Sequence, residues 1–67
     1  MITYRITFRS DIFAKTPDHI RKLVIDVEFK ERSEMQEVWD YTFSEDPKGF
    51  QEFLNTDPSV VEWELVS

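Results

Sequence analysis

Few residues in this chain are of types that catalyse reactions, and their spacing assembles no catalytic site. His19 is the only histidine, and there is no cysteine. A Ser–His–acid triad would need a serine and a carboxylate to converge on His19, and nothing in the spacing indicates this. His19 stands in the segment TPDHIR, at an expected helix start. We therefore expect a histidine at the surface and a protein that is not an enzyme.

Metal, phosphate and cofactor sites also lack the residues that they need. Zinc is usually held by cysteine and histidine, and this chain has no cysteine and no second histidine. The acids near Gly49 lack the alternating spacing of a calcium loop, and Asp46 is better explained as a helix cap. One glycine cannot build a phosphate-binding loop. We expect no metal and no cofactor.

Closely spaced carboxylates are the remaining candidates for acid–base chemistry. They occur as Asp26/Glu28, Glu34/Glu37 and Glu62/Glu64. A glycosidase pair needs a cleft and one raised pKa. On a strand, residues two apart lie on the same side, so the first and last pairs are expected on a solvated face, balanced by arginines.

Charge is divided unevenly along the 67 residues, whose net charge is −6. Residues 1–24 contain five basic and two acidic residues, a net charge of +3, and residues 25–67 contain three basic and twelve acidic residues, a net charge of −9. An acidic surface repels nucleic acid and anionic membranes, and it permits basic protein partners or mimicry of nucleic acid. We expect no direct nucleic-acid or membrane binding.

The composition indicates one folded domain over residues 1–67. Hydrophobic residues make up 40% and aromatic residues 15%, which is too apolar for a disordered tail. No uncharged run approaches the roughly 20 residues of a membrane span. Because the chain has no cysteine and does not open with a signal-like pattern, we expect a complete small protein of the cytoplasm.

Alternation of apolar and polar residues predicts strands at residues 2–9, 23–30 and 59–66. In the first, Ile2, Tyr4, Ile6 and Phe8 are expected to face the core. In the second, Leu23, Ile25, Val27 and Phe29 are expected inside, with Val24, Asp26, Glu28 and Lys30 outside. In the last, Val61, Trp63 and Leu65 are expected inside, with Val60, Glu62, Glu64 and Val66 outside.

Residues 31–44 fit two patterns almost equally. As a strand they would bury Trp39, Tyr41 and Phe43, with a hairpin loop at residues 31–35. As a helix they would align Met35, Val38, Trp39, Thr42 and Phe43 on one side, with a capping box from Ser33 and Gln36. The strand is slightly favoured because the residues of high β-propensity cluster in 38–43.

Two helices are expected, at residues 17–22 and 46–56. Thr16 and Pro17 are typical of the start of the first, and Ile12 and Phe13 are expected to tuck under the sheet edge before it. Asp46 would cap the second helix, Pro47 would take its first position, and Asp57-Pro58 would end it. Its apolar side would be formed by Phe50, Phe53 and Leu54.

These elements predict an α+β fold: a small antiparallel sheet of three or four strands with helix packed on one face. Arg5 and Arg9 on the first strand oppose acids on the others, and opposite charges stabilise neighbouring strands. The first strand is therefore expected in the sheet interior, with the acidic strands beside it. Both a ferredoxin-like order and a meander followed by a returning last strand and packed helix satisfy this.

Valines on the outward sides give a second possible use for the surface. Val24, Val38, Val60 and Val66 lie where polar residues are expected. Scattered valines are tolerated on strands, but valines rimmed by acids also suit a dimer or a basic, partly apolar partner. The residues predicted to bind a partner are Glu34, Glu37, Asp40, Glu62, Glu64, Val38 and Val60.

The last third of the chain resembles the closing helix and strand of ACT-like regulatory domains. The resemblance rests on Phe50, Phe53 and Leu54, then Pro58 and the segment VVEWELV. It implies a regulatory module that binds a small ligand at a homodimer interface. The glycine customary before the last strand is absent, and no ligand residues are carried over.

The residues themselves favour a different function, binding to another protein without catalysis. The partner would be basic or would itself bind nucleic acid, and the chain would act as its stoichiometric inhibitor or regulator. One version is nucleic-acid mimicry, in which carboxylates replace phosphates, as in small acidic proteins of mobile elements. Mimicry requires the carboxylates to form one contiguous stripe.

Overall fold

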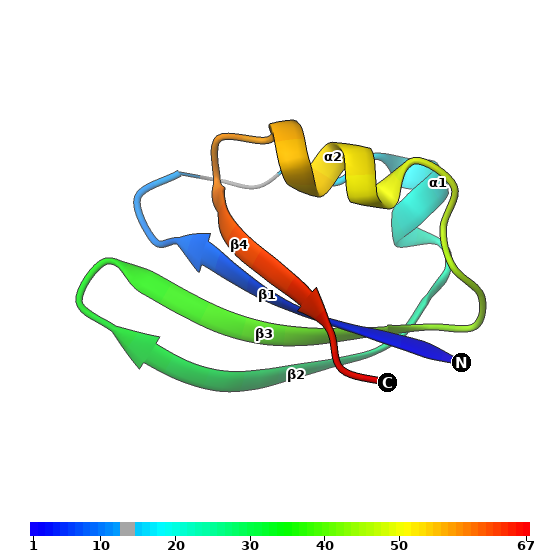
Figure 1. Cartoon of the computed structure of the whole chain (residues 1–67), viewed down its shortest axis with the longest axis horizontal. Coiled ribbons are helices and arrows are strands. Elements are labelled where there is room, and N and C mark those ends of the chain that lie inside the picture. Colours follow the sequence, from blue (N-terminus) through cyan, green and yellow to red (C-terminus); the bar gives the residue numbers. More distant parts are fainter. Residues whose placement is uncertain (13–14) are drawn as a thin grey trace.

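In the part of the chain that the structure describes, four strands and two short helices follow one another in the order β-α-β-β-α-β (Figure 1). The computed structural model describes residues 1–12 and 15–67. The elements are β1 (Ile2–Arg9), α1 (Asp18–Arg21), β2 (Val24–Ser33), β3 (Gln36–Phe43), α2 (Phe50–Thr56) and β4 (Val60–Leu65). The sheet is antiparallel with the order β2-β3-β1-β4, and both helices lie on one face of it. This confirms the α+β prediction in its ferredoxin-like version.

Strand β1 lies in the sheet interior, as predicted from its arginines. It pairs with β3 from Ile2↔Phe43 to Arg9↔Gln36 and with β4 from Tyr4↔Leu65 to Phe8↔Val60. Strand β2 does not lie beside β1, because its hairpin with β3 places it at the sheet edge. The expectation that all acidic strands flank β1 is therefore wrong for β2.

Residues 36–43 form a strand, so the helical alternative for residues 31–44 is wrong. Trp39, Tyr41 and Phe43 point to the helix-covered side, since they pair with the core-facing residues of β1. The loop is shorter than predicted: β2 continues to Ser33, and only Glu34 and Met35 form the turn. An ion pair of 2.8 Å between Arg32 and Glu37 extends the hairpin toward this turn.

The core lies between the sheet and the helices. Its buried residues are Tyr4, Ile6, Ile20, Phe43, Phe50 and Leu54. The Tyr4 ring meets Phe50 edge-on at 4.9 Å and Phe43 at 6.0 Å between ring centres. Phe53 packs against this cluster, so the predicted apolar side of α2 is confirmed.

The predicted inner side of β2 is largely exposed. The side chains of Ile25, Val27 and Phe29 are 52%, 43% and 47% exposed. A register shift between Val24 and Asp26 makes Ile25 an extra residue, and it turns Val24 rather than Ile25 onto the core. Val27 and Phe29 lie on the helix-covered side of the sheet, but at its β2 edge, away from α2, which packs against β4.

The sides of the β4 residues also differ in part from those predicted by alternation. A register shift at Thr7/Phe8 places Val60 opposite Phe8 and leaves Val61 as the extra residue. Val60 packs against the core, whereas Val61 is 45% exposed, so the predicted sides of these two valines are reversed. Trp63 faces the core as predicted, and Leu65 is half exposed at the edge.

Both helices start later than the sequence suggests. Helix α2 begins at Phe50 after Gly49, whose φ of 83° is left-handed, and no side chain caps it. Asp46 instead accepts a 2.6 Å hydrogen bond from the Tyr4 hydroxyl, so its predicted capping role is wrong. Helix α1 is a single turn in which Pro17 is the cap rather than the first helical residue, because the amides of Ile20 and Arg21 donate to its carbonyl.

The connection between β1 and α1 was expected to place two apolar residues under the sheet edge. Ile12 is half-buried, and Phe13 lies outside the described residues.

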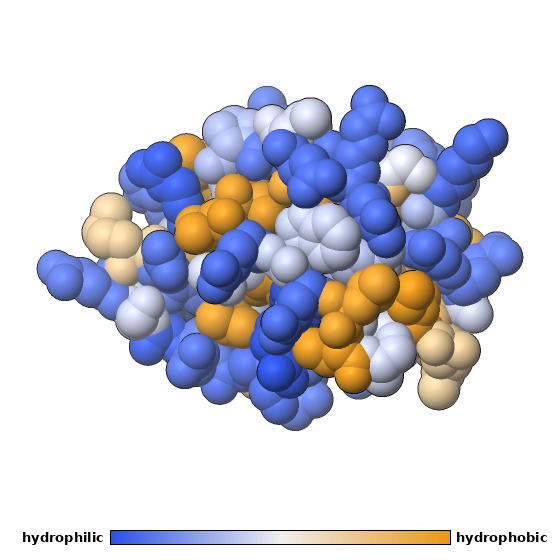
Figure 2. All heavy atoms as spheres, in the orientation of Figure 1, coloured by the Kyte–Doolittle hydropathy of each residue, from blue (hydrophilic) through white to orange (hydrophobic). Residues whose placement is uncertain are grey.

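In the described ranges, no helix is both long enough and apolar enough to span a membrane. Figure 2 shows that apolar residues reach this side of the surface in separate patches between hydrophilic ones.

Candidate functional site on the open face of the sheet

The sheet face turned away from α1 and α2, called the open face below, carries polar residues in rows across the strands. Directly opposed residues of an antiparallel sheet share a face, so the register defines these rows. The central row is Glu28, Asp40, Arg5 and Glu64. The next row is Glu31, Val38, Thr7 and Glu62, and on the other side lie Asp26, Thr42 and Thr3.

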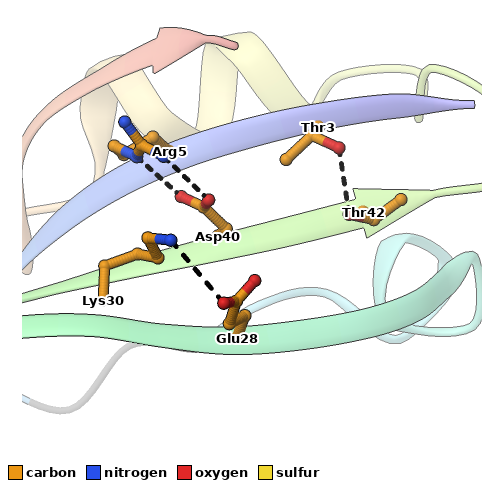
Figure 3. A network of polar contacts seen from close by, with 6 residues as sticks. All are labelled: Thr3, Arg5, Glu28, Lys30, Asp40 and Thr42. Atoms are coloured by element: carbon orange, nitrogen blue, oxygen red, sulfur yellow. Dashed lines mark hydrogen bonds and ion pairs between the residues drawn. The ribbon is translucent and has the colours of Figure 1, made fainter. Parts of the chain in front are cut away.

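Arg5 and Asp40 form the centre of the open face (Figure 3). Arg5 donates from Nε to Oδ1 at 2.9 Å and from Nη2 to Oδ2 at 3.0 Å. The hydrogen bonds from Arg5 hold the pKa of the Asp40 carboxyl below its usual value, against the opposing effect of burial. The carboxylates of Asp40, Glu64 and Glu28 in turn raise the pKa of Arg5.

Two further contacts order this surface. Lys30 reaches back to Glu28 at 3.6 Å, and the hydroxyls of Thr3 and Thr42 are hydrogen-bonded at 3.0 Å across β1 and β3 (Figure 3). Among the described residues, Arg5, Arg9 and Lys30 are the bases of the open face, against a larger set of acids: Asp26, Glu28, Glu31, Asp40, Glu62 and Glu64. The face is therefore acidic even after its internal ion pairs are formed.

A shallow hollow of about 260 Å³ lies between the edges of this face. It is lined by Arg5, Thr7, Glu31, Val38, Glu62, Trp63 and Glu64. Within residues 1–12 and 15–67, Glu31, Glu62 and Glu64 make no ion pair. A lysine or arginine side chain suits this hollow, because its aliphatic part can lie on Val38 while its charge meets carboxylates.

The structure brings together only part of the predicted partner-binding set. Asp40, Glu62, Glu64 and Val38 share the open face. Glu37 lies on the opposite side, where it pairs with Arg32 and accepts a 3.1 Å hydrogen bond from Trp39 Nε1. Val60 packs on the core, and Glu34 lies in the hairpin turn.

Sequence reasoning missed three residues of this surface. Arg5 was assigned only a pairing role, yet it lines the hollow. Alternation placed Glu28 on the outward side as one of a solvated pair, but it was not among the residues predicted to bind a partner. Glu31 reaches the open face through a register shift between Phe29 and Glu31, for which the sequence carries no visible signal.

The acids do not form the single stripe that mimicry of nucleic acid requires. One row follows β2 and another follows β4, with β3 and β1 between them. Three inter-strand spacings separate these rows by roughly 14 Å. Arg5 stands between them, so the arrangement is better suited to a basic chain lying across the face.

Other kinds of site are not assembled in the part of the chain that the structure describes. There, no three histidine, aspartate or glutamate side chains come together as metal ligands. His19 is exposed on α1. Comparisons of the chain with protein-family models, curated protein sequences and solved structures give no match, so the resemblance to ACT-like domains finds no support there.

Proposed function

We propose that this chain is a non-catalytic, protein-binding domain whose open face holds a basic segment of another protein. The observation that carries the proposal is the hollow beside Arg5, where Glu31, Glu62 and Glu64 surround Val38 and have no ion-pair partner of their own among the described residues. Carboxylates on two edges with an apolar floor between them complement a lysine or arginine side chain in both shape and charge.

Charge along the chain supports a basic partner. The net charge of −6 repels phosphate groups, and the bidentate contact with Asp40 already engages the one arginine in the centre of the face. A domain that covers a basic surface stoichiometrically would compete with whatever that surface normally binds, including nucleic acid. In this proposal the protein is an inhibitor or regulator, and a cytoplasmic location fits its lack of cysteine.

The test compares two triple variants that lose the same charge. Glu31→Gln/Glu62→Gln/Glu64→Gln empties the hollow of carboxylates, whereas Glu34→Gln/Glu45→Gln/Glu52→Gln removes three exposed acids elsewhere. Proteins captured from host lysate by the wild type are identified, purified and titrated against all three forms. We expect the first variant to bind roughly tenfold more weakly or worse, and the control to bind like the wild type.

A peptide probe locates the contact. A short lysine-rich peptide added to isotope-labelled protein should shift the NMR signals of Thr7, Val38 and Glu62 first, and added salt should reverse the shifts. If both triple variants bound the partner equally weakly, the loss of affinity would come from overall charge, and the proposal would be contradicted. Peptide-induced shifts confined to residues outside the open face would also contradict it.

A further inference from the structure

Strand β2 is an edge strand with an unusual amount of exposed apolar surface. Among the described residues it pairs with β3 alone, which leaves the N–H and C=O groups of its other edge available to a further strand. Ile25, Val27 and Phe29 are each between 43% and 52% exposed. Phe29 packs edge-on against Trp39 at 5.2 Å between ring centres, which holds its ring at the sheet edge.

The charges on β2 are self-complementary about one point. In an antiparallel pair of two β2 strands related by a two-fold axis at Phe29, Glu28 faces Lys30 of the other copy. An axis at any other residue from 26 to 31 would oppose two like charges. A two-fold axis placed between two consecutive residues would pair each residue with one whose side chain points to the other face of the sheet.

We propose that two copies of this chain associate through their β2 edges, with the axis at Phe29, to form one continuous eight-stranded sheet. In this pairing the two Phe29 rings meet across the axis and each Glu28 meets a Lys30. The proposal concerns the sheet edge and does not depend on partner binding at the open face.

The bulges of β2 indicate how strong the association of two copies should be. Register shifts between Val24 and Asp26 and between Phe29 and Glu31 interrupt the regular strand, and such bulges shorten the ladder that an edge can form. The uninterrupted part of β2 therefore runs from Asp26 to Phe29 and ends at the proposed axis, which keeps the paired segment short. A small interface of this kind gives a weak dimer in exchange with the monomer.

Single cysteines test the register, because the chain has none of its own. Opposed Cα atoms of antiparallel strands are about 4.5–5.5 Å apart, which is within the range of a disulfide. Under mild oxidation Phe29→Cys should form a disulfide-linked dimer. Val27→Cys, which is on the same strand and similarly exposed, should not, since two copies of residue 27 would lie roughly 13 Å apart along the strands.

Charge exchange tests the interface without a covalent link. Sedimentation over a concentration series should show the dimer dissociation constant rising roughly tenfold in Glu28→Lys and in Lys30→Glu, because each opposes like charges twice about the axis. The double variant Glu28→Lys/Lys30→Glu restores both pairs and should dimerise like the wild type. Glu64→Lys, on β4, should leave dimerisation unchanged, and circular dichroism verifies that every variant is folded.

Three results would overturn the proposal. The first is a wild-type chain that stays monomeric up to millimolar concentration. The second is a dimer that is equally strong in both single charge variants. The third is a Val27→Cys variant that crosslinks as readily as Phe29→Cys, which would place the axis elsewhere.

Discussion

Arg5 of β1 and Asp40 of β3 face each other on the open face and are joined by two parallel hydrogen bonds of 2.9 and 3.0 Å. The Asp40 side chain is only 11% exposed, whereas that of Arg5 is 38% exposed. The pair fixes the register of the two central strands and neutralises the middle of the face. Among the described residues, Glu31 of β2 and Glu62 and Glu64 of β4 make no ion pair.

Replacing Asp40 by asparagine should destabilise the fold by about 1 kcal/mol at neutral pH, because the charge of the bidentate acceptor is lost on a face open to solvent. Arg5 holds the pKa of Asp40 down in the folded state, so this stabilisation is present above the pKa of the unfolded chain. It is lost as pH falls through the lowered pKa. Urea unfolding should show the wild type and Asp40→Asn converging in acid, and a constant difference would contradict the assignment.

Tyr4→Phe should cost about 1 kcal/mol, because the buried hydroxyl donates to Asp46 and accepts a 3.1 Å hydrogen bond from Gln51. Burial, followed by the contact with Asp46, raises the pKa of Tyr4 above 10.0. The stabilisation is therefore present below that value and lost as pH rises through the raised pKa. Tyr41→Phe is the control, since the Tyr41 hydroxyl has no hydrogen-bond partner among the described residues. Thermal unfolding at neutral pH should separate the two variants, whereas burial also raises the pKa of Tyr41, so both tyrosines lose stabilisation in alkali.

Gly49→Ala should destabilise the chain by about 1 kcal/mol through backbone conformation alone. A Cβ at this position would meet no atom within 4 Å, so crowding plays no part, whereas the φ of 83° disfavours any ordinary side chain. Asparagine tolerates the left-handed region better, and Gly49→Asn should lose less stability. Equal costs in urea unfolding would contradict this explanation.

Val60 and Val61 are adjacent valines that should respond differently to the same substitution. Val60→Ala removes methyl groups that pack against the core and should cost about 1–2 kcal/mol. Val61 is 45% exposed at the register shift, so Val61→Ala should change stability by less than about 0.5 kcal/mol. If chemical denaturation showed a larger loss of stability for Val61→Ala than for Val60→Ala, Val61 would be the core residue, as simple alternation predicts.

Alternation predicted the strands of this protein well and their faces only in part. Ile2 to Phe8 alternate without interruption, and β1 follows that pattern through its whole length. In β2 and β4 an extra residue shifts the pattern by one position, which exchanges the faces of the residues on one side of it. The position of such a bulge depends on the neighbouring strand, and so it cannot be read from the strand's own sequence.

The candidate site was predictable to the extent that it depends on alternation within one strand. Glu62 and Glu64 share the open face as expected, and Asp40 lies there with Val38. Glu37 was grouped with Asp40 because both are acidic and close in sequence. Residues three positions apart on a strand point to opposite faces of the sheet, so the two side chains are separated. Asp46 was expected to cap a helix, whereas its carboxylate accepts a hydrogen bond from the hydroxyl of Tyr4, 42 residues away.

The strand order also determines how this chain can fold. Tyr4 pairs with Leu65, so the central strand is completed by residues from nearly the opposite end of the sequence. Pairings of such high contact order are slow to form, since a long loop must close before they yield any stabilisation. Until β4 docks, β1 is an edge strand whose outer N–H and C=O groups are unpaired. We therefore expect refolding to be slower than in helical proteins of this size and to compete with aggregation at high concentration.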